Sequence, residues 1–386
     1  MKVLIFAKGN AYEKEIAFAL QENNIDYTFV TTYPKYFLKK HFINIQNIKS
    51  FFILEILKRL LIKLYKFTNF NFLKNDKIDM YINTITDGIF STCINKDYDL
   101  LIVYQSNHWL KSISKAKKLN VKTLYLLAIS SSSFKKKTLA DECKKLGLNE
   151  HYTQDAFVTD QKTEDVIKIS DFVGYTSSYQ LETFKNSNFN TQNFYYLPQP
   201  TNTSVYPIIH KKDHDEKFIV LFVGNDFIRK GAKYLIDAFN NLSLKNAELW
   251  MLGIDLQKYA SILKLNNKNI KFFGAVKDLD IIDYYKKSSV LCLPSFEEGF
   301  PIVIPRAMTF GLPIITTHYG SDFIQNYING FLVDPGNTNQ LEQNIKYLYD
   351  NPLELQKMSK NSSNTHNKFF TPKIYVQRLI TSIFND

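Results

Sequence analysis

Residues 294–313 read PSFEEGFPIVIPRAMTFGLP, a turn rich in Gly and Pro that follows the apolar run Val290–Leu293 and opens a helix-like segment. A strand-to-helix turn presents unpaired backbone N–H groups and the positive end of the helix dipole. Such a turn suits a phosphate or a ring of hydroxyls. Gly299 allows close approach because it lacks a Cβ. We therefore expect Glu298 to orient the hydroxyls of a bound sugar.

The alternation of apolar runs and helix-sized segments continues on both sides of this turn. Phe218–Val223 predicts a strand, Gly224–Gly231 a loop, and Lys233–Asn240 a helix with one apolar side. The pattern is typical of a doubly wound parallel sheet. Further strands are predicted at Glu248–Leu252, Ile270–Phe273, Ile314–Thr316 and Phe331–Val333.

The N-terminal half repeats this organisation. Val3–Ala7 predicts a strand, Glu13–Gln21 a helix and Ile25–Val30 a second strand. The sequence therefore predicts an α/β protein with two Rossmann-like, doubly wound domains. Additional buried strands of the first domain are predicted at Leu100–Tyr104, Thr123–Ala128 and Phe172–Tyr175.

The length of 386 residues also favours two domains, because one hydrophobic core rarely grows this large. We predict an N-terminal domain at 1–200, a linker at 201–217 that follows Pro198-Gln199-Pro200 and is rich in charge, and a C-terminal domain at 218–370. Residues 371–386 are predicted as a helix that packs back on the first domain. Ligands collect at the carboxyl ends of strands in such sheets, so the chemistry is expected in the cleft between the domains.

Composition limits the location of the protein and its partners. The formal net charge of +11 fits nucleic acid, anionic lipid or phosphate-bearing substrates. Cys93, Cys143 and Cys292 are too few and too far apart for a disulfide framework, and the histidines show no metal-ligand spacing. The first nine residues break their apolar run too early for a signal peptide, and no stretch of eighteen apolar residues predicts a membrane span. A cytoplasmic location is expected.

Residues 34–77 carry ten Lys or Arg but only Glu55 and Asp76 as acidic residues. Helical spacing predicts an amphipathic basic helix here. It either lies in an anionic lipid interface as a peripheral anchor or packs against the N-terminal sheet. Charge gathered beside an apolar face argues against nucleic acid. The apolar face holds Ile53, Leu54, Ile56, Leu57, Leu60, Leu61 and Leu64, and the opposite face Glu55, Lys58, Arg59, Lys63 and Lys66.

The segment around Glu298 resembles the group 1 family of glycosyltransferases of the GT-B fold, whose signature is a Glu-Gly-Phe turn followed by a helix that ends in Gly-x-Pro, here Gly311–Pro313. The resemblance covers most of Phe218–Asp350. The short loop that ends in Arg229-Lys230-Gly231 looks like that of lipopolysaccharide-core glucosyltransferases.

The resemblance implies roles for individual residues. Glu298 would contact the donor hexose and Lys230 its diphosphate. The family's phosphate loop commonly starts with Gly-Arg, which is Gly224-Asn225 here, and Arg229 would substitute for that arginine. A cation at this turn offsets the diphosphate charge and replaces a divalent metal, so no metal or cofactor is expected beyond a UDP- or GDP-sugar donor. The alternative for Lys230 is a solvated lysine without a role in binding. The alternative for the glycines is that they lie in ordinary turns. Further residues implied at the donor are Gly274, Val276, Gly299, Phe300, Pro301, Ile302 and Val303, with Gly9 in the first N-terminal loop.

Besides Asn225, two positions depart from the family pattern. Arg306 stands where the family usually has a second Glu that binds the ribose, and a cation cannot accept hydrogen bonds from hydroxyls. Ala128 stands where many relatives have a histidine. Either the ribose is held differently, or the donor or the activity differs. Arg306 is expected either to contact the nucleotide or to be an exposed helical residue.

The function implied is transfer of a hexose to a glycan or glycolipid acceptor in surface polysaccharide or lipopolysaccharide synthesis of bacterial type. By the same resemblance, the reaction would retain the anomeric configuration without a metal. The alternatives are a degenerate, non-catalytic GT-B protein that binds a glycan or a partner, and a nucleic-acid binder.

Overall fold

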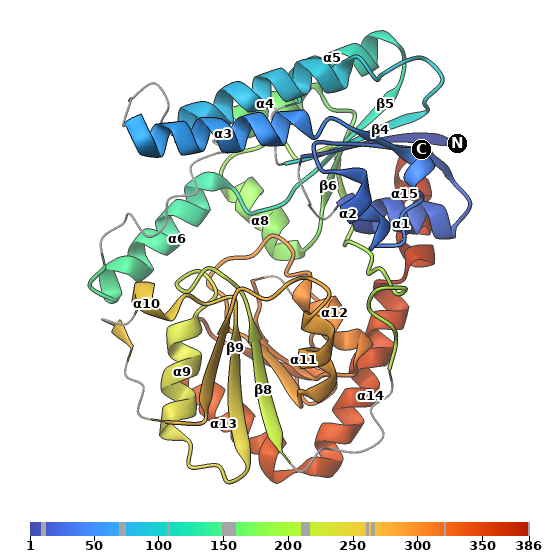
Figure 1. Cartoon of the computed structure of the whole chain (residues 1–386). Coiled ribbons are helices and arrows are strands. Elements are labelled where there is room, and N and C mark those ends of the chain that lie inside the picture. Colours follow the sequence, from blue (N-terminus) through green and yellow to red (C-terminus); the bar gives the residue numbers. More distant parts are fainter. Residues whose placement is uncertain are drawn as a thin grey trace.

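The computed structural model has two domains, and each is a parallel sheet with helices packed on it (Figure 1). The structure describes residues 1–8, 13–68, 75–105, 109–148, 160–209, 217–259, 262–263, 267–319 and 322–384, with the backbone alone described for 65–68, 75–77 and 258.

The N-terminal sheet has the strand order β3-β2-β1-β4-β5-β6-β7, and all neighbouring strands are parallel. Its central strands are apolar and buried on both faces, as parallel strands require. The strand order changes direction between β1 and β4, which is where a doubly wound sheet forms its ligand crevice. The strands are β1 (Lys2–Ala7), β2 (Asp26–Thr31), β3 (Ile48–Ser50), β4 (Leu100–Tyr104), β5 (Lys122–Leu126), β6 (Phe172–Tyr175) and β7 (Phe194–Tyr196).

Helices pack on both faces of this sheet and divide its core into two clusters. Ile16 and Leu20 of α1 pack on one face, and Phe90 of α4 and Ile113 of α5 pack on the other. The helices are α1 (Glu13–Glu22), α2 (Lys35–Lys39), α3 (Ile53–Thr68), α4 (Asn75–Ser91), α5 (Leu110–Lys118), α6 (Ser132–Lys145), α7 (Asp160–Ile169) and α8 (Ser178–Asn186).

The C-terminal sheet has the order β10-β9-β8-β11-β12-β13 and is also fully parallel. Here the order changes direction between β8 and β11, so the loops after these two strands border the predicted crevice. Its elements are β8 (Phe218–Val223), α9 (Ala232–Asn241), β9 (Ala247–Leu252), α10 (Leu256–Tyr259), β10 (Ile270–Gly274), α11 (Ile281–Lys287), β11 (Val290–Leu293), α12 (Val303–Thr309), β12 (Ile314–Thr317), β13 (Gly330–Val333) and α13 (Thr338–Asp350).

Two final helices join the domains. α14 (Pro352–Phe369) packs on α12 of the C-terminal domain, and α15 (Pro372–Phe384) packs on α1 of the N-terminal domain (Figure 1). Tyr375 and Leu379 of α15 are buried in the same core cluster as β1. The chain thus returns to its first domain after completing the second.

The residues that connect the domains are packed rather than loose. Val205 and Tyr206 are buried against the C-terminal core, and the Thr201 N–H donates to the Phe370 carbonyl at 2.8 Å. The described part of the predicted linker is therefore a fixed connection.

The predicted apolar side of residues 53–64 is divided between two environments. Leu54 is 7% exposed and Leu61 packs on Ile78 and Ile82 of α4, whereas Ile56 and Leu60 are 48% and 57% exposed. The seven apolar residues do not share one environment, because α4 covers only one side of α3. The covered side packs on α4, and lipid contact of the exposed side stays a prediction.

Candidate donor-binding site

The loops after β8 and β11 lie against each other at the carboxyl edge of the C-terminal sheet. Gly231 has a φ of 65°, and a Cβ there would lie 2.1 Å from the Pro294 carbonyl oxygen. The Phe296 N–H donates to the Arg229 carbonyl at 2.8 Å. Only glycine permits this approach at position 231. The contact brings the predicted phosphate loop beside the predicted sugar-binding turn.

The side chains of both loops meet in a buried ionic cluster. Lys230 Nζ pairs with Glu298 Oε1, and Arg229 Nη1 lies 3.2 Å from Glu298 Oε2. The Ser295 hydroxyl donates to Glu298 Oε1 at 2.7 Å. Three residues singled out in the sequence are therefore brought together. The alternative of a solvated Lys230 is wrong, because this lysine is buried.

The cluster keeps Glu298 ionised. Burial by itself raises the pKa of this carboxyl, but the charges of Lys230 and Arg229 outweigh it and lower the pKa below its usual value. Burial lowers the pKa of Lys230, opposed by Glu298. A carboxylate held between two cations has its oxygens ready to accept hydrogen bonds from hydroxyls, and the cations are ready to receive an anion.

The sugar-binding turn also touches the N-terminal domain. Glu297 Oε1 accepts hydrogen bonds from the Ser130 N–H at 3.1 Å and the Ser130 hydroxyl at 2.8 Å. The Thr176 hydroxyl donates to the Gly299 carbonyl at 3.1 Å. A Cβ on Gly299 would lie 1.9 Å from the Ala128 carbonyl oxygen. Ala128, the residue aligned with the family histidine, therefore faces the predicted donor turn.

Gly299→Ala is expected to destabilise the contact between the domains. The added methyl group meets backbone atoms of residues 128 and 129, which cannot rotate away as a side chain can. Overpacking of this kind costs about 1–3 kcal/mol. Thermal unfolding of the variant measures the loss. Gly88→Ala is the control, because a Cβ there has no atom within 4 Å; equal stability of the two variants would contradict the tight contact.

The residues after Gly299 combine packing with available backbone donors. The Phe300 ring packs on Phe370 with 6.0 Å between ring centres, and Ile302 is buried just before α12. Within the described part of the chain, the N–H groups of Gly299 and Phe300 donate no hydrogen bond. These two groups fit the predicted role of backbone donors to sugar hydroxyls. Pro301 and Val303, which complete the predicted set, occupy the turn into α12 and its first residue.

Gly274 ends β10 and Val276 lies in the loop that follows, where the family resemblance implies contact with the nucleotide base. The Gly274 carbonyl accepts a hydrogen bond from the Gly253 N–H at 2.6 Å, which joins this loop to the one after β9. Val276 packs on the C-terminal core. Both residues lie at the carboxyl edge of the sheet, and their contact with a base stays a prediction.

Arg306 lies at the centre of a second buried cluster, which joins the domains. Its Nη2 lies 2.7 Å from Glu15 Oε1 of α1, and its Nη1 lies 2.9 Å from Asp278 Oδ1 in the loop after β10. The guanidinium stacks over Tyr206 at 4.3 Å from the ring centre. The alternative of an exposed helical residue is wrong, because the side chain is 7% exposed. Arg306 connects the two domains, and a contact with the donor stays a prediction.

Neighbouring groups extend this Arg306 cluster. Lys14 Nζ lies 2.6 Å from Asp278 Oδ2, and the Asn202 N–H donates to Glu15 Oε2 at 2.6 Å. The nearby cations lower the pKa of Asp278, although burial opposes them. Sequence reasoning missed Glu15, Lys14 and Asp278. The sequence marks these residues only by their place after predicted strands. Lys14 and Glu15 lie in the first turn of α1, and Asp278 follows Gly274 by four residues.

Some sequence predictions fall outside this description. Gly9, predicted at the donor, lies outside the described residues. Among the residues that the structure describes, no three His, Cys, Asp or Glu side chains gather as metal ligands would, and no helix has the length and apolarity needed to cross a membrane. The expected metal independence stays a prediction.

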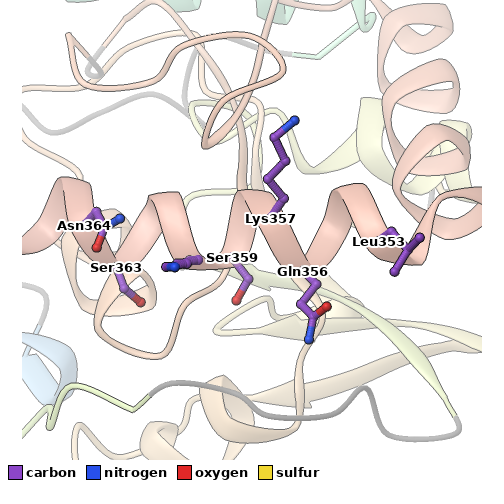
Figure 2. Close-up of a pocket in the computed structure, with 7 residues that line it drawn as sticks. Leu353, Gln356, Lys357, Ser359, Ser363 and Asn364 are labelled. Carbon is purple, nitrogen blue, oxygen red and sulfur yellow. The ribbon is translucent and has the colours of Figure 1, made fainter.

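Two hollows lie outside the predicted donor site. One of about 320 Å³ lies between the domains, beside Tyr179, Glu182 and Tyr319. The other, of about 620 Å³, follows α14 (Figure 2) and contains none of the predicted donor residues. The described residues that line the second hollow are Leu353, Gln356, Lys357, Ser359, Lys360, Ser363 and Asn364.

Comparison with known proteins agrees with this geometry. Residues 207–365 match the sequence profile of the family Glycosyl transferases group 1. An uncharacterized glycosyltransferase of Haemophilus influenzae is 31% identical over 38% of this chain and 44% of its own length. The lipopolysaccharide glucosyltransferase WaaG of Escherichia coli is 30% identical over 36% of this chain and 40% of its own length. The matched region thus spans less than half of each of these relatives.

A fold comparison extends over the whole chain. The crystal structure of HepE from Anabaena in complex with UDP superposes with a TM-score of 0.67 at 14% identity, covering 100% of both chains. The predicted GT-B architecture is therefore confirmed. Residues 207–365 match the group 1 glycosyltransferase family, and this match confirms the resemblance inferred from the Glu298 turn.

Proposed function

We propose that this protein transfers a hexose from a nucleotide diphosphate sugar to a glycan or glycolipid acceptor. The observation that carries the proposal is the cluster of Glu298, Lys230 and Arg229 at the carboxyl ends of β8 and β11. The Glu298 carboxylate can accept hydrogen bonds from the hydroxyls of the sugar. The two cations beside it can bind the diphosphate, which is the other half of such a donor. The family match over residues 207–365 supports the same reaction.

In this proposal, donor binding exchanges partners within the cluster. The diphosphate oxygens accept hydrogen bonds from Lys230 and Arg229, and Glu298 turns to the sugar hydroxyls. As the bond between the sugar carbon and the phosphate oxygen breaks, the cations stabilise the negative charge that develops on the departing diphosphate. They perform the work for which other transferases use a divalent metal. Retention of the anomeric configuration is proposed from the family resemblance alone.

The acceptor is proposed to be a saccharide of a bacterial-type surface polysaccharide or lipopolysaccharide. The name of the similar Escherichia coli protein, lipopolysaccharide glucosyltransferase, supports this class. UDP is the nucleotide in the Anabaena complex that shares the fold, and a UDP- or GDP-sugar is the proposed donor. We propose that the protein works in the cytoplasm on an acceptor presented at a membrane surface.

One observation favours a second candidate, a GT-B protein that binds a glycan or a partner without turnover. Arg306, at the position of the usual ribose ligand, is held in ion pairs by Glu15 and Asp278. Such a protein would keep the fold and lose donor binding.

A thermal-shift screen with UDP-, GDP-, ADP- and CDP-sugars tests the donor. Ligand at a hundred times its Kd stabilises the native state by about 2.7 kcal/mol, which raises the melting temperature. We expect one nucleotide class to give this shift, and slow hydrolysis of that sugar to continue in excess EDTA. NMR of the product identifies the anomer. A folded protein that neither shifts nor hydrolyses any of these sugars would favour the non-catalytic candidate, and inhibition by EDTA would overturn metal independence.

A further inference from the structure

The outer side of α3 carries apolar side chains that remain exposed, together with Phe52 just before the helix. We name Phe52, Ile53, Ile56, Leu57 and Leu60 the α3 ridge, whose members are between 40% and 69% exposed. Successive residues of an α-helix turn by about 100°, so the four helical members share one side. Scattered exposed apolar residues are ordinary, but a contiguous set of this size marks an interaction surface.

Basic side chains border the ridge. Arg59 and Lys63 follow its margin along the same helix, and both are exposed. Lys39, Lys40 and Lys49 are exposed in the segment that leads into α3. The ridge therefore combines an apolar strip with a positive margin, in a stretch where residues 34–77 hold ten basic and two acidic residues.

We propose that the α3 ridge docks on the anionic surface of a lipid bilayer. A helix that lies in the interface inserts its apolar side among the acyl chains and places its cations at the headgroups. A second copy of this chain is a poorer partner, because it would oppose two positively charged margins. Nucleic acid would use the cations and leave the apolar strip in water.

The inner side of the same helix is linked to the cleft. Lys58 of α3 forms an ion pair with Asp79 of α4. One turn further along α4, Asn83 Oδ1 accepts a hydrogen bond from Lys8 Nζ. Lys8 Nζ lies 4.0 Å from Asp79 Oδ1. Lys8 directly follows β1, at the edge of the N-terminal sheet where ligands of this fold collect. Docking through α3 would thus hold the cleft at a fixed position relative to the lipid, which, on the proposed function, favours a lipid-linked saccharide as acceptor.

Vesicle flotation of the full chain tests the ridge. The probes are vesicles of phosphatidylcholine with about one third phosphatidylglycerol, and vesicles of phosphatidylcholine alone. We expect binding to the anionic vesicles, at least tenfold weaker binding to the neutral ones, and a further decrease with added salt. The double variant Ile56→Asn and Leu60→Asn is expected to bind anionic vesicles at least tenfold less than the wild type.

Leu353→Asn is the matched control, because Leu353 is an exposed leucine, at 80%, on α14 of the other domain. It is expected to bind vesicles like the wild type. Equal vesicle binding by the ridge variant and the wild type, or no binding to anionic lipid, would overturn the proposal. So would light scattering that finds a wild-type dimer and a monomeric ridge variant. Donor hydrolysis in the absence of lipid is expected to be the same in the ridge variant and the wild type. If neither protein hydrolyses a donor, the proposed function is rejected, whatever the result with vesicles.

Discussion

Lys230→Ala and Glu298→Gln are each expected to lower kcat/KM for the donor by a factor of about 10²–10³, the usual loss when one group that stabilises developing charge is removed. Lys230→Ala removes the cation nearest to Glu298, and Glu298→Gln keeps the shape of the side chain but removes its charge. Initial rates with the donor identified by thermal shift measure both effects.

The matched control for Lys230 is Lys233→Ala. Lys233 lies one turn further along, in α9, and pairs with Asp237 at 2.5 Å outside the cluster. Its removal is expected to leave the rate within about threefold of wild type. Chemical denaturation of each variant separates lost chemistry from lost folding. A Lys230→Ala protein that is folded and as active as the Lys233→Ala protein would contradict the role of the cluster.

Arg306→Met is expected to destabilise the protein by about 3–5 kcal/mol, the usual cost of removing one partner from a buried ion pair. Met fills a similar volume but leaves Glu15, which is 1% exposed, without the cation that it contacts at 2.7 Å. Because Arg306 and Glu15 belong to different domains, the contact between domains is expected to loosen first.

Denaturant unfolding measured by tryptophan fluorescence checks this expectation. The control is Arg59→Ala, which removes an arginine that is 68% exposed and pairs with Glu55 of its own helix. Exposed pairs of this kind contribute at most about 1 kcal/mol. An Arg306→Met protein no less stable than the Arg59→Ala protein would show that the buried cluster does not hold the domains together.

Local patterns allowed much of the fold to be predicted. The runs Phe218–Val223 and Val290–Leu293 match β8 and β11 residue for residue, because a strand buried on both faces is a continuous apolar run. The short strands β3 and β7 were missed. They lie at the two edges of the N-terminal sheet and have three residues each, which is too short for a periodic signal.

The site could be predicted only in part. Glu298, Lys230 and Arg229 occur in short motifs that mark them, and the fold brings these motifs together. The Arg306 cluster was not predictable, because Arg306 and Glu15 are 291 positions apart and neither residue type indicates its partner. The same limit applies to α3, where the position of α4 decides which apolar residues are buried and which are exposed. Helical periodicity predicts the apolar side of a helix but not which neighbour covers it.

The return of α15 to the first domain affects how the chain is made. The N-terminal core is completed by Tyr375, Val376 and Leu379, which are synthesised after the C-terminal domain. While the ribosome still holds the C-terminal domain, the cluster around β1 therefore lacks part of its apolar cover. Folding of the N-terminal domain is then expected to finish after that of the C-terminal domain. Loss of α15 would leave the apolar core around β1 exposed and prone to aggregation.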